Sequence, residues 1–497
     1  MHNIKFSESH TGKEHHQLTI AKEPSDEAKC ANDIHSKLNL TRHNEIIKVT
    51  SGSEVQELLT AQKYAGCSFS IAGGRHAMGG QQFLCDGILL DTRGLNKVVD
   101  FCPVRGLLTA QSGMLWGDLV FHLGELNKKH NSDWSIVQKP TGADDISLGG
   151  SLASNIHGRV LGRRPFIADI ERFTAILADG NRITVSRSKN EELFRLAIGG
   201  YGMFCFVEDV TIRLTKSSKL QRKVELTNSK DLIGRFAELQ SAGARYGDFQ
   251  FCIDASNDSF LNNGILSAYF PVQDDTTDNT TDIKLSENNW RELLRLAHVD
   301  KAKAFTTYSN HYQRTDGQIY SSQTFQLSLY VPDYHESIDA ERVESQNKSS
   351  HVKASEMITE LYVPRSKLHE FLQSAKIALK RQCADVIYGT VRLIEKDTES
   401  FLAWAKEDYA CVIFNLHIDH NQLSILRAKH SFRTLIEIAL ELNGSYYLTY
   451  HRYATKEQLL AAYPQFPSFI QKKIDYDPHG KFRSTWFNQM CLTVQAD

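Results

Sequence analysis

The chain has 497 residues, 41% hydrophobic and 23% charged, a composition that excludes a disordered protein and a coiled coil. Lys and Arg number 57 against 59 Asp and Glu, which argues against nucleic acid as a partner, because a nucleic-acid backbone requires a basic surface. The length predicts two or three domains. No stretch approaches the roughly 18 apolar residues of a transmembrane segment, and the N-terminus has no apolar signal region.

The nine cysteines are scattered along the chain without a Cys-x-x-Cys pair. They predict reduced thiols in a cytoplasmic protein, with neither a disulfide framework nor a metal site. Residues 1–41 are polar and contain five histidines. Because nothing in this segment fixes a ligand geometry, we expect a solvated, partly mobile N-terminal extension and not a metal-binding tail.

Residues 42–218 alternate between short apolar strands and amphipathic helices. The predicted strands cover residues 46–49, 67–72, 88–91, 107–111, 170–177, 182–185 and 206–214. The predicted helices cover residues 51–65, with Ser51 or Ser53 as N-cap, a segment that opens at 112–119, and residues 191–197. This order predicts a first domain of mixed α/β units.

After about residue 216 the pattern changes to strands with alternating faces, mixed with amphipathic helices. The predicted strands cover residues 250–253, 264–270, 324–330, 357–363, 386–393, 411–419 and 446–451. Two polar stretches, 274–282 and 335–351, predict surface loops. Compact helical signals return after residue 455, so a second domain with an antiparallel sheet is expected, followed by a C-terminal segment.

Three glycine-rich clusters, at 73–80, 149–158 and 199–202, lie between strands and helices. One cluster alone predicts a tight turn, but three within about 130 residues favour a bound ligand of dinucleotide size, because glycine lets backbone amides approach phosphates closely. We expect the amides of 73–80 and 149–155 to hold the phosphates. No G-x-G-x-x-G follows the first strand and no Walker pattern exists, so a Rossmann or P-loop site is not supported.

These segments carry a resemblance to a known family. AGGRHAMGGQQF, at 72–83, resembles the first FAD loop of cytokinin dehydrogenases. The stretches 148–180 and 192–214 match the same family, the vanillyl-alcohol oxidase superfamily, also called the p-cresol methylhydroxylase type. Asn-Ile-His-Gly at 155–158 is closer to the decaprenylphosphoryl-ribose oxidases, and the stretch 461–487 resembles that branch and the sugar and aldonolactone oxidases.

The resemblance implies a two-domain α+β flavoprotein. It implies a two-subdomain FAD-binding domain over 42–218, a substrate domain over 219–445 whose antiparallel sheet covers the flavin, and a C-terminal segment, 446–497, that returns to the FAD-binding domain. The positions expected to bind FAD are Gly73, Gly74, Arg75, His76, Ala77, Gly80, Gln81, Thr141, Gly149, Gly150, Ser151, Ser154, Asn155, His157, Gly158, Gly202 and Val207.

The resemblance leaves two registers open at His76. With Gly80-Gln81 as anchor, His76 falls on the position that carries FAD covalently in several family members, through the 8α-methyl group of the flavin. This loop, however, reads Arg75-His76-Ala77 where the family has Gly-His-Ser, and a one-residue shift aligns His76 with the serine of the noncovalent branch. The strand lysine of that branch is replaced here by Tyr450, so a mechanism that requires the lysine does not carry over.

Polar side chains alternate along several strands of the second domain. The candidate catalytic residues are Tyr388, Arg392, Asn415, His417 and Tyr450. Strand alternation places Tyr388 with Arg392, and Asn415 with His417, on common faces. Any one of these residues can have a purely structural role, but the set favours a polar, hydroxyl-bearing substrate. His157 either approaches the flavin or packs in a tight loop.

We therefore expect an FAD-dependent oxidoreductase that oxidises a CH–OH group of a polar alcohol, sugar or sugar-derived substrate by hydride transfer to flavin N5. One alternative is a flavin-dependent reductase of a carbon–carbon double bond, as in the sterol-reductase relatives of the family. Another is a scaffold that kept only the fold. The expected partners are a small-molecule substrate and an electron acceptor that the sequence does not identify.

Overall fold

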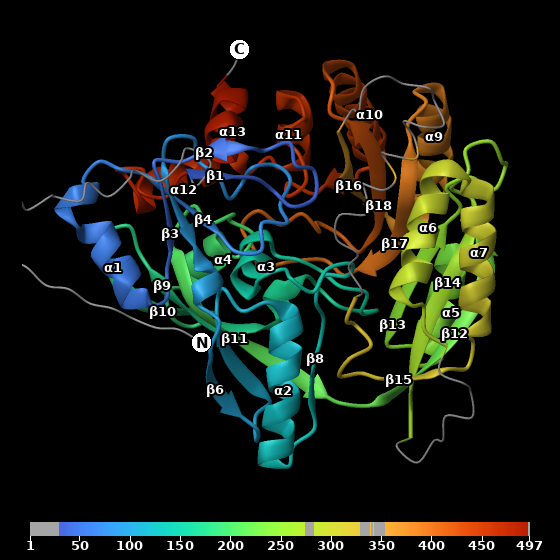
Figure 1. Cartoon of the computed structure of the whole chain (residues 1–497), viewed down its shortest axis with the longest axis horizontal. Helices are drawn as coiled ribbons and strands as arrows, with labels where there is room; N and C mark the ends of the chain where they lie inside the picture. The colour runs from blue at the N-terminus through green and yellow to red at the C-terminus, as the bar shows by residue number, and fades with distance from the viewer. Residues whose placement is uncertain (1–28, 274–282, 329–337, 339–340, 342–352, 496–497) are drawn as a thin grey trace, which may run out of the picture.

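The computed structural model describes residues 29–273, 283–328, 338, 341 and 353–495, which form two main bodies (Figure 1). The first body is built from the chain up to Lys216, together with the C-terminal helices. The second is an eight-stranded sheet with helices on both of its faces. Four of the five N-terminal histidines lie outside the described residues.

The first body contains two sheets of different kinds. A parallel sheet has the order β3 (Glu45–Lys48), β5 (Ile88–Asp91), β4 (Phe69–Ala72). An antiparallel sheet has the order β10 (Arg182–Ser186), β9 (Ile170–Ile176), β11 (Phe206–Lys216), β7 (Leu107–Gln111), β6 (Val98–Cys102), and β8 (Trp134–Ile136) pairs with the end of β11. This arrangement differs from a doubly wound Rossmann sheet and agrees with the expected fold.

The helices of the first body follow local sequence signals. Ser51 caps α1 (Gly52–Thr60) by accepting a hydrogen bond from the amide of Glu54 at 3.2 Å. α1 ends earlier than predicted, because Ala61 is extended and a short 3₁₀ turn follows. The remaining helices are α2 (Trp116–His130), α3 (Leu148–Ser154), which begins in a glycine-rich cluster, and α4 (Glu191–Ala197), which matches its prediction.

All neighbouring strands of the second body are antiparallel, as predicted. The order is β15 (Ile319–Ser321), β12 (Lys219–Asn228), β14 (Asn263–Val272), β13 (Tyr246–Phe251), β17 (Val386–Ile394), β18 (Tyr409–Asp419), β16 (Ala354–Pro364), β19 (Ser445–Tyr446). The strands predicted at 264–270, 357–363, 386–393 and 411–419 belong to this sheet, and the strand predicted at 250–253 overlaps only the end of β13.

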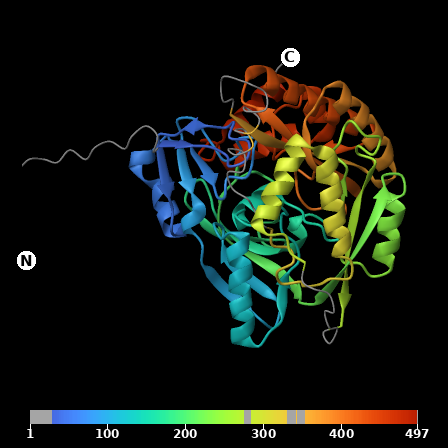
Figure 2. The same cartoon turned by 45° about the vertical axis from the view of Figure 1, so that its right-hand side comes forward.

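Helices cover both faces of the large sheet. α6 (Glu287–Val299) and α7 (Lys301–Arg314) lie side by side in front of it in Figure 2, and α5 (Leu232–Ser241), α9 (Leu368–Arg381) and α10 (Gln422–Glu441) cover the other face. Alternation along β18 separates the two environments. Phe414 packs against Phe371 of α9, with ring centroids 6.5 Å apart, whereas Ile413 and Asn415 face the side of α6 and α7.

Two predicted strands are wrong. The chain leaves the sheet after Tyr446, because the carbonyl of Thr449 accepts hydrogen bonds from the amides of Met78 and Gly79, both at 3.2 Å. Residues 324–328 form turns, in which the amide of Phe325 donates to Ser321; residues 329–330 lie outside the described residues. Contacts with the first body replace strand pairing in the 447–451 segment.

Part of the segment expected to be a solvated extension is packed. Residues 29–41 form β1 (Cys30–Ala31), which pairs with β2 (Thr41–Arg42), and a turn held by the buried carboxylate of Asp33. Asn39 donates from its side-chain amide to the carbonyl of Met78 at 2.7 Å. The segment therefore packs on the first glycine-rich loop.

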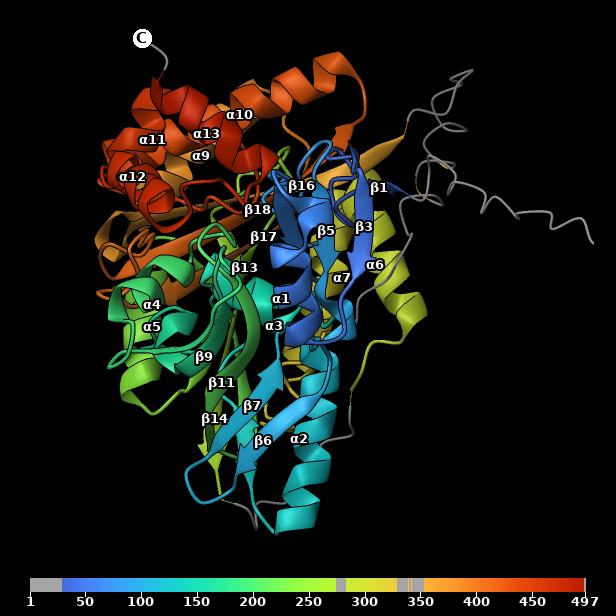
Figure 3. The same cartoon turned by 90° about the vertical axis from the view of Figure 1, so that its left-hand side faces the viewer.

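The C-terminal helices α11 (Lys456–Ala462), α12 (Phe466–Tyr476) and α13 (Thr485–Gln495) lie above the first body in Figure 3. Phe482, fully buried, forms a parallel bridge with Phe69 of β4, whose amide donates to Lys481 at 2.6 Å. The rings of Trp486 and Tyr201 pack with centroids 4.8 Å apart. These contacts make the tail part of the core of the first body.

Replacing Phe482 with Ala should lower the free energy of unfolding by about 3–5 kcal/mol, because the cavity left beside Phe69 cannot close. Thermal denaturation followed by circular dichroism measures the change. Leu492→Ala is the matched control, since Leu492 is 67% exposed and should change stability by less than about 0.5 kcal/mol. Equal melting temperatures for Phe482→Ala and Leu492→Ala would contradict a structural role for the tail.

Candidate active site

A cavity of about 930 Å³ lies between the glycine-rich loops and the α6/α7 face of the large sheet. The expected FAD contacts that line it are Gly73, Gly74, Arg75, His76, Ala77, Gln81, Thr141, Gly149, Gly150, Ser154, His157, Gly202 and Val207. The expected catalytic residues that line it are Tyr388, Arg392, Asn415 and Tyr450. Two sets chosen from distant parts of the sequence therefore meet at one cavity, whose volume suits a cofactor together with a small substrate.

Five expected residues do not reach the cavity wall: Gly80, Ser151, Asn155, Gly158 and His417. Ser151 is buried and accepts a hydrogen bond from the indole of Trp116 at 2.8 Å. Asn155 ends α3 in a left-handed conformation, with φ of 48°. The ring of His417 packs edge-on against that of His298 of α6, with centroids 5.1 Å apart. These positions support the loops and the sheet.

The first loop offers free hydrogen-bond donors to the cavity. Within the described residues, the amides of 74–77 donate to no protein acceptor, and the buried hydroxyl of Ser112 has no partner. Unpaired donors at a cavity wall suit the phosphate and hydroxyl oxygens of a dinucleotide. The second loop differs, because the Gly149 amide donates to the Ser112 carbonyl at 2.7 Å and the Gly150 amide to Ser147 Oγ at 3.2 Å.

His76 has other groups next to both of its ring nitrogens. Nδ1 lies 2.8 Å from Nε2 of His35, and Nε2 lies 3.0 Å from Oδ1 of Asp145. Burial raises the pKa of Asp145, but the hydrogen bond and charge of His76 outweigh this effect and hold that pKa below its ordinary value. Asp145 therefore orients the ring through Nε2. A bond from Nδ1 to another group requires His35 to release its contact.

A buried carboxylate, Glu360, lies at the centre of a polar network where the two bodies meet. Nε2 of His157 lies 2.6 Å from Oε1 of Glu360, and the hydroxyl of Tyr362 donates to the same oxygen at 2.5 Å. The thiol of Cys411 donates at 3.2 Å. Burial raises the pKa of Glu360, but the charge of His157 and these hydrogen bonds hold it below its ordinary value. The carboxylate is therefore ionised at neutral pH.

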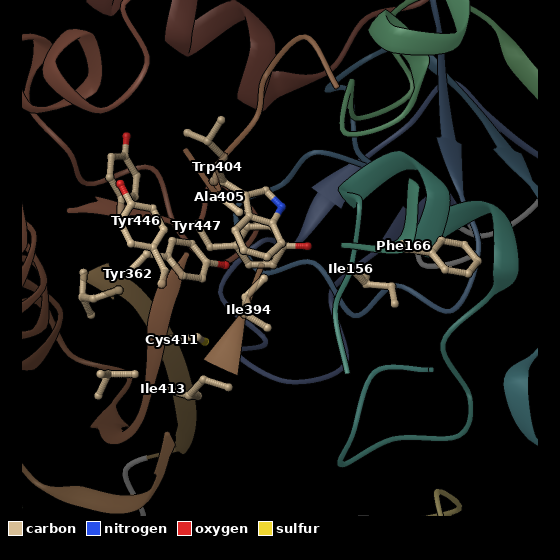
Figure 4. Close-up of a cluster of buried hydrophobic side chains, with 14 of the residues drawn as sticks. Ile156, Phe166, Tyr362, Ile394, Trp404, Ala405, Cys411, Ile413, Tyr446 and Tyr447 are labelled. Atoms are coloured by element: carbon tan, nitrogen blue, oxygen red, sulfur yellow. The ribbon is translucent and has the colours of Figure 1, made fainter. Parts of the chain in front are cut away.

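Buried aromatic side chains pack beside this network, and Figure 4 shows Trp404, Tyr362 and Tyr447 lying together. The ring of Tyr362 stacks on that of Trp404 at 4.4 Å, and Trp404 packs against His157 at 5.4 Å. Tyr447 completes the cluster edge-on. Excluding water from Glu360 strengthens the electrostatic interactions around it.

His157, Glu360 and Cys411 are also the one group within the described residues whose ligand atoms lie close enough, within 4.8 Å, to hold a metal ion. The separation of 2.6 Å between Nε2 and Oε1 is that of a hydrogen bond. It is too short for two ligands that each lie at about 2.0–2.2 Å from one tetrahedral ion. The arrangement is therefore a proton network and not a metal centre.

Tyr450 and Tyr388 approach the cavity from two sides. Burial together with the charge of the nearby Glu360 raises the pKa of Tyr450 well above its ordinary value. Tyr388 keeps 39% of its surface accessible although it lies on a covered sheet face, because its side chain faces the cavity. Asn415 donates from its side-chain amide to Glu356.

Sequence reasoning did not include Glu360, Ser112 or His35 among the site residues. Glu360 stands among apolar neighbours in the sequence, and that isolation within a buried strand is the one signal that marks it. No local sequence signal marks Ser112 as a site residue. Its place at the cavity depends on the distant Gly149, whose amide donates to the Ser112 carbonyl. His35 lies in the segment that was expected to be solvated.

Comparison with known proteins agrees with this geometry. Residues 44–186 match the family model described as an FAD binding domain, and residues 271–490 match the model described as D-arabinono-1,4-lactone oxidase. The chain belongs to the vanillyl-alcohol oxidase superfamily of flavoproteins. FAD is accordingly its cofactor. The residues at the cavity fit this cofactor, since free amides line one wall. Among the described residues, no helix is long and apolar enough to cross a bilayer.

Individual relatives are distant. The flavoprotein is 24% identical to cytokinin dehydrogenase 2 of Arabidopsis thaliana over 267 residues, 52% of this chain and 50% of that protein, so it matches about half the length of that relative. It is 21% identical to L-gulono-1,4-lactone dehydrogenase of Mycobacterium tuberculosis over 88% of this chain and 93% of that protein. It is 24% identical to L-gulonolactone oxidase of Bos taurus over 37% of this chain and 40% of that protein.

Replacing Gly74 with Val should yield protein with little bound flavin, because a side chain at this position collides with the backbone carbonyl of Asp145 and displaces the free amides. The ratio of flavin to protein absorbance measures occupancy. Gly124→Ala on α2 is the control, since an added methyl group there meets no other atom within 4 Å. A folded Gly74→Val protein with full flavin content would contradict the assignment.

Proposed function

We propose that this flavoprotein oxidises a CH–OH group of a polar, sugar-like substrate to a carbonyl group. The observation that carries the proposal is the ionised, buried Glu360, which lines the same cavity as Tyr450 and the glycine-rich loops. A removal of hydrogen from an alcohol needs a proton acceptor beside the flavin. The names of two relatives, which act on gulonolactones, support a sugar-derived substrate.

The domain limits and cofactor contacts belong to the same proposal. We propose an FAD-binding domain over 42–218, a substrate domain over 219–445 and a C-terminal segment over 446–497. The residues proposed to hold FAD are those of the predicted set that line the cavity, with Ser112 added. A cytoplasmic location is supported by the nine cysteines, all of which are free thiols.

FAD, when bound, supplies the hydride acceptor. The task of the chain is then to remove the hydroxyl proton of the substrate. Because burial and the charge of Glu360 raise the pKa of Tyr450, a free tyrosinate is unstable there. The proton of the substrate therefore passes to Glu360, which lines the cavity, and His157 keeps the carboxylate in place.

Glu360→Gln should slow reduction of the bound flavin by about 10²–10⁴-fold, because the amide cannot accept the proton. Anaerobic stopped-flow absorbance with a panel of polyols, sugars and aldonolactones measures the rate. Glu370→Gln on the surface of α9 is the control. An unchanged rate of flavin reduction in Glu360→Gln would overturn the role of Glu360 as proton acceptor. Bleaching of the flavin by NADPH, but by no member of the panel, would favour the double-bond reductase.

The pH dependence provides a second test of Glu360. Its pKa is held below the ordinary value, so the base form is present at neutral pH and is lost only as pH falls through that depressed pKa. The rate of flavin reduction should therefore stay level from neutral to mildly acidic pH. Tyr362→Phe removes a hydrogen bond to the carboxylate and should move the acid limb to higher pH. If Tyr362→Phe leaves the acid limb of the pH–rate profile where it is in the unmodified protein, the titration does not belong to Glu360.

We propose that His76 forms the covalent bond to FAD, with Nδ1 as the attacking nitrogen because Asp145 holds Nε2. Acid-precipitated protein should then stay yellow and fluoresce on a denaturing gel. His76→Ala should release the flavin under the same treatment. Release of free FAD by the unmodified protein would show noncovalent binding and leave the oxidoreductase activity unaffected.

A further inference from the structure

Three arginines that come from separate elements line the cavity. Arg159 follows α3, Arg222 lies on β12 and Arg392 lies on β17. Tyr308 and Tyr312 of α7 line the same cavity from the helix side. We call these five residues the arginine chamber. Four of them belong to the large sheet or α7 and lie outside the loops expected to hold the FAD phosphates.

The chamber holds more positive than negative charge. Within the described residues, Asp248 is the one carboxylate in an ion pair with any of the three arginines, 3.3 Å from Nη1 of Arg159. Arg222 instead donates to the hydroxyls of Tyr269 and Thr315, both at 2.9 Å. Its guanidinium also lies about 5 Å from three tyrosine ring centroids. Three cations and one carboxylate leave two positive charges uncompensated, and such charges are costly away from water.

In the part of the chain that the structure describes, Arg392, too, has no carboxylate partner. It is only 8% exposed, its guanidinium donates to the hydroxyl of Thr141, and its Nε has no hydrogen-bond partner. Nε of Arg159 is likewise without a partner. Nearby carboxylates do not supply the missing charge, because Glu356 is paired with His298 at 3.3 Å and Glu360 with His157. The chamber therefore has guanidinium donors that no protein group satisfies.

We infer that the arginine chamber binds an oxyanion of the substrate, a carboxylate or a phosphate group. The planar fork of arginine matches both groups and binds them with paired hydrogen bonds. The tyrosine rings fix the orientation of Arg222 and keep water away. This inference rests on the proposed function: the chamber holds the charged end of a polyol or sugar while the reacting CH–OH group lies at Tyr450 and Glu360.

Matched pairs of probes test the inference without turnover. D-gluconate is compared with sorbitol, and glucose 6-phosphate with glucose, by perturbation of the flavin spectrum and by thermal shift of the flavin-loaded protein. At least one anionic probe should bind about tenfold or more tightly than its uncharged counterpart, and the arm that responds identifies carboxylate or phosphate. Equal binding within both pairs, or no binding of either anion, would overturn the inference.

Variants separate recognition of the anion from folding and from catalysis. Arg222→Gln should weaken binding of the anionic probe by about 10- to 100-fold and leave the uncharged probe and the flavin content unchanged. Arg222→Lys should recover part of the affinity, and Arg291→Gln, on the exposed side of α6, should have no effect. Loss of flavin, or equal loss of both probes, in Arg222→Gln would show a structural or cofactor role and refute the inference. If the anionic probe binds selectively but no probe reduces the flavin, the arginine chamber is supported. In that case only the proposed oxidation is contradicted.

Discussion

The hydrogen bond of 2.6 Å between His157 and Glu360 is the contact on which the site depends. His157 belongs to the loop after α3 and Glu360 to β16, so the bond joins the two bodies through buried atoms. Removing either partner would leave a charged or polar group buried without compensation, which is more costly than the loss of the bond itself. The aromatic cluster around Trp404 excludes water from the pair, so a distorted or broken hydrogen bond cannot be replaced by one to water.

A short segment of chain connects this pair to the first glycine-rich loop. The carbonyl of Leu448 accepts from the side-chain amide of Gln81 at 2.6 Å, and that of Thr449 accepts from two amides of the same loop. The charge of Glu360 raises the pKa of the next residue, Tyr450, which therefore lies near that carboxylate. Three consecutive residues thus connect the first glycine-rich loop to the surroundings of Glu360.

The sequence predicted the elements whose signals are local. The Ser51 cap, the β5 strand and the α4 helix follow from capping and periodicity, and the glycine clusters indicated the cavity wall. The resemblance identified the cofactor. Residues 446–451 were read as one strand because their alternation is that of a strand, whereas tertiary contacts with residues 78–81 decide their conformation. Glu360 was missed as a site residue because its partners come from three distant segments.

The bridge between the tail and β4 has a consequence for synthesis of the protein. Ser68 donates to the carbonyl of Gly480, and the two residues are 412 positions apart. At about 5–20 residues per second, the ribosome needs about 20–80 seconds to make the intervening chain. During that time β4 lacks the partner that covers Phe69, and its apolar surface is open to aggregation. The first domain to be translated is thus among the last to be finished.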